Sequence, residues 1–249
     1  GNAQLNYVLQ SRRIYHVSNN TSYGYALQRG PGWEMINNLK NFGNLPNSLV
    51  KMLPYATGQG VWKGGTASDN LTSNWGQSNN NGDMARLLTE LNNVATRPDI
   101  IISGYNTDNL GTALRDAIVD FVNQGGVYIM FNESSSTDIT YVINRIFDTN
   151  GIVTRNLGPS GSMYPLLQTE DNDRVLNGPF GDARGKLWGE DASTTHGIIG
   201  LPANSALIYS YGQAINRAPN VTDAAAVTMF KHKTKNFFYL GDGGLVSYN

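Results

Sequence analysis

The chain lacks several features that would point to a function class. Its 249 residues include no cysteine, which excludes disulfide scaffolds, thiol nucleophiles and cysteine-ligated zinc sites. Charged residues make up only 15%, against about 25% in ordinary soluble proteins, and the formal net charge is −1. Nucleic-acid binding is therefore not expected, because it requires a basic surface. No apolar run approaches the roughly 18 residues of a membrane span, so none is predicted.

Uncharged side chains supply the polarity that charged ones do not. The chain is rich in asparagine, serine, threonine and tyrosine, while its hydrophobic fraction of 40% still suffices to bury a core. A neutral surface of this kind is typical of bacterial cell-envelope proteins, and the opening residues GNAQLNYVLQ do not form a secretory signal. We therefore expect a mature exported protein, periplasmic or on the cell surface. Residues 1–249 are expected to form a single domain excised from a longer chain.

Residues 97–132 contain the clearest structural pattern. The β-branched run Asp99–Ser103 predicts a buried strand, and Val127–Phe131 predicts a second. Between them, apolar residues spaced three and four apart predict a helix over Leu110–Val122, ended by the following Gly-Gly pair. This is a strand-helix-strand unit of the length that joins two parallel strands.

Further strands and helices alternate with this unit. Strands are expected over Arg13–Val17, 48–53, Ala206–Tyr211, Ala225–Phe230 and Asn236–Leu240, and helices over Trp33–Leu39, Asp83–Ala95 and Asp138–Phe147. Residues 55–82 and 158–200 show no periodicity and are expected to be long loops. The alternation predicts an α/β fold, with a mainly parallel sheet, helices on both of its faces and an antiparallel C-terminal extension.

Short segments that look like binding motifs depart from them. GDARGK at 181–186 has three residues between its glycines where a phosphate-binding loop has four. EDNDR at 170–174 lacks the spacing of a calcium loop and favours an exposed acidic turn. Among the histidines, His16 lies in a predicted strand and His232 in a predicted solvated turn, whereas His196 lies in a loop beside carboxylates. No metal or cofactor is expected.

Position in the predicted sheet supplies candidate residues that motifs do not. Ligands of open α/β sheets bind beyond the carboxyl ends of the parallel strands. The residues expected to bind a ligand are Tyr105, Asn106, Asp108 and Asn132, together with Trp62 and Trp188, whose rings could stack on sugars. The candidates for acid-base catalysis are Glu133, Asp191, His196 and Asp242, since carboxylates about 5 to 10 Å apart can cleave glycosidic bonds. Each has a structural alternative, because polar residues after strands commonly close turns and large rings commonly fill small cores.

RPDIIISGYN, the helix after it and FVNQGGVYIMFNES together resemble the class I glutamine amidotransferase-like fold, particularly its trehalose-utilisation (ThuA-like) branch. DRVLNGPFGDARGKLWGEDAS and FFYLGDGGLVSY are similar to further segments of that branch. The resemblance covers residues 97–249, more loosely 13–249, and implies a flavodoxin-like fold. In the amidotransferases the strand matching Val127–Phe131 leads into the nucleophilic cysteine, whereas here Asn132, Glu133 and Ser134 follow. Glutaminase chemistry is therefore not expected.

The N-terminal third also resembles surface proteins of Gram-negative gut bacteria, some of them associated with adhesion. The favoured hypothesis is a noncatalytic domain of an exported or cell-surface protein that recognises a glycan or a protein partner. The alternative is a carbohydrate-active enzyme that uses carboxylates at the carboxyl ends of the strands.

Overall fold

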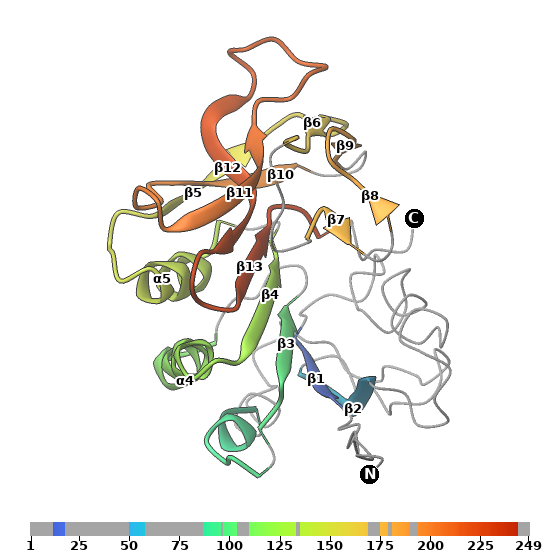
Figure 1. Ribbon diagram of the computed structural model, residues 1–249. Helices are drawn as coiled ribbons and strands as arrows, with labels where there is room; N and C mark the ends of the chain where they lie inside the picture. Colours follow the sequence, from blue (N-terminus) through green and yellow to red (C-terminus); the bar gives the residue numbers. More distant parts are fainter. Residues whose placement is uncertain are drawn as a thin grey trace, which may run out of the picture.

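A computed structural model describes residues 12–17, 50–57, 87–95, 97–103, 110–132, 135–168, 175–178, 181–189 and 194–243. These residues form a nine-stranded mixed sheet with the order β2-β1-β3-β4-β13-β12-β10-β5, in which β11 pairs with β12 (Figure 1). The expected helix at 33–39 lies outside the described residues.

One part of the sheet is parallel. Its strands are β2 (Val50–Thr57), β1 (Arg12–Val17), β3 (Ile100–Ser103), β4 (Val127–Phe131) and β13 (Phe237–Leu240). Strand β13 comes from the far end of the described chain, yet it lies between β4 and β12 at the centre of the sheet. Its buried Phe237 and Tyr239 join the main core, as do Tyr128 and Met130 of β4.

The other part of the sheet is antiparallel. It consists of β12 (Asp223–His232), β10 (Thr195–Ile199), β5 (Val153–Leu157) and β11 (Ala206–Gly212). Two small ribbons accompany it, formed by β6 (Tyr164–Pro165) with β9 (Leu187–Trp188) and by β7 (Asn177–Gly178) with β8 (Gly181–Asp182). A second core cluster lies here, around the side chains of Leu157, Tyr164 and Trp188.

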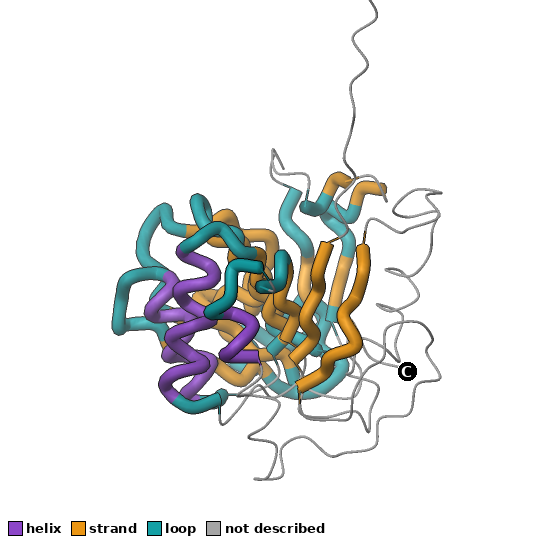
Figure 2. Tube along the Cα trace, turned by 90° about the horizontal axis from the view of Figure 1, so that it is seen from below, coloured by secondary structure: helices purple, strands orange, loops and turns teal. Residues whose placement is uncertain are grey.

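The described helices gather on one face of the sheet. They are α4 (Thr112–Asn123), α5 (Thr137–Ile146) and a helical turn at 87–91, and Figures 1 and 2 show all three on the same side. Helix α4 ends as predicted at the Gly-Gly pair, since the N–H of Gly126 donates to the carbonyl oxygen of Phe121 at 2.9 Å while Gly125 has φ +91°. The strand-helix-strand unit predicted over 97–132 is thus confirmed.

The predicted fold class is nevertheless wrong. The described chain is mainly β, its sheet is mixed, and its helices cover one face where a flavodoxin-like fold has helices on both. The error has a physical origin in residues 153–200. Strand β5 is an exposed edge strand with the polar sequence VTRNL, and β10 has only two apolar aliphatic residues, so neither shows the continuous apolar run of a buried parallel strand.

Candidate functional site

The structure describes four of the predicted site residues. Those that lie outside the described residues are Trp62, Tyr105, Asn106, Asp108, Glu133 and Asp191. The four that are described are Asn132, Trp188, His196 and Asp242, and all four side chains are buried.

Asn132 follows β4 and belongs to a buried hydrogen-bond chain. Its side-chain amide donates to the hydroxyl oxygen of Tyr239 at 2.9 Å, and that hydroxyl donates to the carbonyl oxygen of His196 at 2.9 Å. The backbone N–H of Asn132 donates to the carbonyl oxygen of Leu240 at 2.8 Å. Burial raises the pKa of Tyr239 far above its usual value, so this hydroxyl stays protonated and remains a donor. These hydrogen bonds therefore link β4, β13 and β10.

His196 and Asp242 lie in the same region, at the carboxyl end of β13. The N–H of His196 donates to the carbonyl oxygen of Gly241 at 2.6 Å, and the N–H of Gly241 donates to that of Thr228 at 2.8 Å. The ring Nδ1 of His196 lies 3.2 Å from the carbonyl oxygen of Thr194, and burial lowers the pKa of the ring. His196 is 5% exposed and Asp242 is 1% exposed. The structure thus brings Asn132, His196 and Asp242 together, but inside the protein. We name this region the carboxyl-edge network: Asn132, His196, Thr228, Tyr239, Gly241 and Asp242.

Trp188 occupies the second core cluster. Its indole N–H donates to the hydroxyl oxygen of Ser210 at 2.8 Å, and that hydroxyl donates to the carbonyl oxygen of Pro165 at 3.0 Å. The indole ring also contacts the ring of Tyr164, with 5.9 Å between their centroids. Trp188 therefore does not stack on a ligand from the surface; its large ring fills a small core, which was the structural alternative.

The GDARGK segment and His232 have structural roles too. Arg184 of the GDARGK segment forms an ion pair with Asp182 at 2.7 Å, and the hydrogen bonds from Arg184 lower the pKa of Asp182 to about 2. His232 was predicted to lie in a solvated turn, yet its ring is buried against Phe147, with 4.5 Å between the centroids. Its Nδ1 accepts the N–H groups of Thr234 at 3.1 Å and Lys235 at 3.0 Å. His232 is the last residue of β12 and the turn begins after it, so both its predicted place in the turn and its predicted solvation were wrong.

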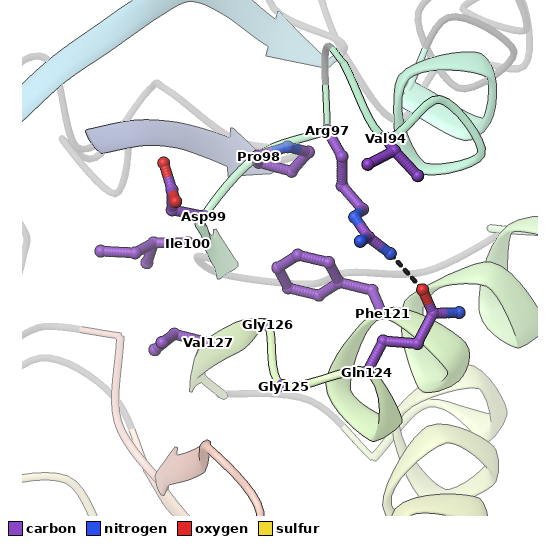
Figure 3. Close-up of a pocket in the computed structure, with 10 residues that line it drawn as sticks. All are labelled: Val94, Arg97, Pro98, Asp99, Ile100, Phe121, Gln124, Gly125, Gly126 and Val127. Atoms are coloured by element: carbon purple, nitrogen blue, oxygen red, sulfur yellow. Dashed lines mark hydrogen bonds between the residues drawn. The ribbon is translucent and has the colours of Figure 1, made fainter. Parts of the chain in front are cut away.

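An open pocket of about 480 Å³ lies at the opposite edge of the sheet, where β3 and β4 begin (Figure 3). It is lined by the segment 97–100, by the end of α4 and the two glycines after it, and by Val94. Arg97 and Gln124 point toward one another across it, and the Arg97 guanidinium donates to the side-chain oxygen of Gln124. We name this the amino-edge pocket.

Sequence reasoning missed the amino-edge pocket. The rule for open α/β sheets directs attention to residues that follow parallel strands, whereas Arg97 precedes β3 and Gln124 precedes β4. The available signal was two polar residues: Gln124, directly before the predicted helix-ending glycines, and Arg97, just before the predicted strand Asp99–Ser103. That signal does not reveal that the two segments adjoin.

The described residues show neither a metal-binding cluster nor a membrane-spanning helix. Within them, no group of three or more histidine, aspartate or glutamate side chains could hold a metal ion. The described helices are all too short or too polar to cross a bilayer.

Comparison with known proteins leaves the family open. No family model matches the chain, and no curated protein matches it. Ten chains of solved structure do match. One is the mmIFT52 N-terminal domain, which is 10% identical with a TM-score of 0.47, over 94% of this chain and 88% of that one. A likeness at this level says nothing about activity.

The resemblance to the glutamine amidotransferase-like fold and its ThuA-like branch is wrong. No family or curated match supports it, and the mixed, mainly β sheet of the described residues differs from the flavodoxin-like fold that it implied. The quoted segments describe a strand, a helix with a Gly-Gly end and a second strand. Those features follow from local chain geometry that many folds share, so they do not identify a family.

Proposed function

We propose that this chain is a noncatalytic recognition domain of an exported or cell-surface protein, and that its ligand is a neutral glycan. One observation carries the noncatalytic part of the proposal. The side chains of Asn132 and His196 at the carboxyl edge serve as hydrogen-bond partners within the protein. A catalytic acid or base must reach the proton that it transfers, and His196 and Asp242 are at least 95% buried.

The composition supports a neutral glycan over a charged partner. A net charge of −1 and 15% charged residues give little electrostatic attraction to charged ligands. Hydroxyl groups of a sugar both donate and accept hydrogen bonds, which matches a surface rich in amide and hydroxyl side chains. The open, polar amino-edge pocket adds a place where a small polar group has access.

A glycan array with the full chain tests this proposal, followed by product analysis on any glycan that binds. We expect binding to uncharged oligosaccharides and no release of shorter products on prolonged incubation. Failure to bind any glycan would refute the proposal. Release of products that stops in Glu133→Gln or Asp191→Asn, with binding retained, would favour the carbohydrate-active enzyme instead.

A further inference from the structure

We infer that the amino-edge pocket is a binding site for one uncharged sugar unit, held by Arg97 and Gln124 at the junction of α4 with the starts of β3 and β4. This inference rests on the proposed glycan recognition and assigns it a place. The volume of the amino-edge pocket, about 480 Å³, lies within the range of roughly 300–1,000 Å³ that is usual for small-molecule sites.

The backbone of Gly125 and Gly126 forms one wall of the pocket, and neither position accepts a larger residue without strain or a clash. A Cβ on Gly126 would lie 2.3 Å from the ring carbons of Phe121, so a larger residue would displace that ring from the core. At Gly125 a Cβ would meet nothing within 4 Å, which shows open space beside the chain, and φ +91° strains any other residue. The backbone of Gly125 therefore has open space beside it, where a ligand can approach closely, whereas the Phe121 ring covers that of Gly126.

Donors and acceptors meet at this wall. The Arg97 guanidinium has five N–H donors, of which one is directed at Gln124 in the structure. Gln124 is exposed, and its amide offers both donor and acceptor positions. The carbonyl oxygens of Asp120, Phe121 and Val122 at the end of α4 already accept the N–H groups of Gln124, Gly126 and Gly125. A ligand that both donates and accepts, as a hydroxyl group does, can therefore use the Arg97 and Gln124 side chains.

The charges around the pocket favour an uncharged ligand. Arg97 carries a positive charge, but it lies at the C-terminus of α4, where the helix dipole is negative. The lining also includes Asp99, whose carboxylate points away from Arg97 in Figure 3. An anion would thus be attracted by Arg97 but repelled by the C-terminus of α4, whereas a neutral ligand has no net charge on which these opposing fields could act. Val94, which is 81% exposed, adds apolar surface against which the C–H face of a sugar ring can pack.

Hydrogen bonds to backbone carbonyl groups hold the pocket in shape without a ligand. The N–H of Val127 donates to the carbonyl oxygen of Asp99 at 3.1 Å, which ties the two strand starts together. The side-chain amide of Asn236 donates to the carbonyl oxygen of Gly125 at 3.0 Å, which fixes the glycine turn against the start of β13. Such preorganisation lowers the entropy cost of binding.

Amide NMR of the full 15N-labelled chain tests the site directly. Glucose, galactose, mannose and N-acetylglucosamine are titrated up to about 0.1 M, far above the millimolar affinities at the weak end of the scale. We expect at least one sugar to shift the amide signals of Arg97, Gln124, Gly125 and Gly126 more than those elsewhere. Arg97→Ala and Gln124→Ala should each weaken that binding about ten-fold or more, since each removes hydrogen bonds to the ligand.

Matched controls separate the site from the surroundings. Asn123→Ala alters the exposed neighbour of Gln124 outside the lining, and Arg155→Ala removes an exposed arginine of the edge strand β5. Both should bind the sugar with an affinity within about two-fold of that of the parent chain, since neither residue lines the pocket.

Three outcomes of the titration overturn the inference: no shifts at the pocket with any of the four sugars, shifts confined to another region, or shifts only with glucuronic acid, which is titrated as a charged comparison. Undiminished array binding by Arg97→Ala and Gln124→Ala overturns the site while the proposed function stands, whereas an empty array refutes the proposed function itself.

Discussion

The two edges of the parallel strands use polar groups in opposite ways. At the carboxyl edge, Asn132, Tyr239 and the backbone of His196 form a closed hydrogen-bond chain that is sealed from solvent. At the amino edge, Arg97 and Gln124 are bonded to each other in an open pocket. Buried polar groups must be satisfied inside the protein, so they stabilise the fold, whereas exposed ones can exchange their partners for a ligand. A polar cluster in a sheet thus has to be judged by its exposure as well as by its position.

The comparison predicts that the carboxyl edge tolerates change least at Gly241. A Cβ there would lie 1.9 Å from the carbonyl oxygen of His196, and that oxygen belongs to backbone that cannot rotate away. We expect Gly241→Ala to lower the free energy of unfolding by more than about 3 kcal/mol, measured by urea denaturation. In Gly151→Ala the new Cβ meets only the Thr149 hydroxyl at 4.0 Å, so that control should change stability by less than about 0.5 kcal/mol. Equal effects of the two substitutions would contradict the tight packing of this edge.

Removal of one hydroxyl should open the carboxyl-edge network. Tyr239→Phe leaves the Asn132 amide and the His196 carbonyl buried without this partner, which costs about 1–3 kcal/mol of unfolding free energy. Tyr211→Phe is the matched control, because Tyr211 is 39% exposed and its hydroxyl can bond to water. Thermal or urea unfolding of the two variants provides the measurement. A Tyr239→Phe variant as stable as the parent would show that these two hydrogen bonds contribute nothing to the free energy of unfolding.

The sequence predicted local units better than long-range partners. The strand–α4–strand unit was predictable because the IIIS run, the helical spacing and the Gly-Gly end are features of adjacent residues. Asn132 was expected to contact a ligand because it follows a strand, but its partner Tyr239 is 107 residues away. No local pattern reports such a partner. Strand β10 was missed for the same reason, since its burial depends on β5 and β12 and not on its own composition.

The stability of the chain should fall in mild acid, with a contribution from each edge. Burial lowers the pKa values of His196 at the carboxyl edge and His232 at the hairpin before β13, and the nearby Lys235 ammonium lowers that of His232 further. The unfolded chain therefore takes up protons more readily than the folded one as the pH falls through about 6.5. The free energy of unfolding should be level above about pH 7.5 and decrease towards pH 5.

Substitution assigns this pH dependence to the two histidines. The Nδ1 of His232 accepts two backbone N–H groups, and protonation would abolish both bonds. The Oδ1 of an asparagine can accept the same donors without titrating, so His232→Asn should reduce the acid-induced loss. His196→Gln should reduce the remainder. Urea unfolding at several pH values gives the comparison, and an unchanged pH profile in both variants would trace the effect to other groups.

The smallest effect on stability is expected where the proposed binding effect is greatest. The hydrogen bond between Arg97 and Gln124 lies at the surface, so water replaces either partner at little cost. Arg97→Ala, Gln124→Ala and the double variant should each lie within about 0.5 kcal/mol of the parent chain in unfolding free energy. The double-mutant cycle should give a coupling energy below about 0.5 kcal/mol. A coupling of several times that size would mean that the pair clamps the end of α4 to the start of β3, and the amino edge would then resemble the carboxyl edge. A small coupling would leave both side chains available to a ligand, because exchanging their mutual bond for bonds to a sugar costs the fold almost nothing.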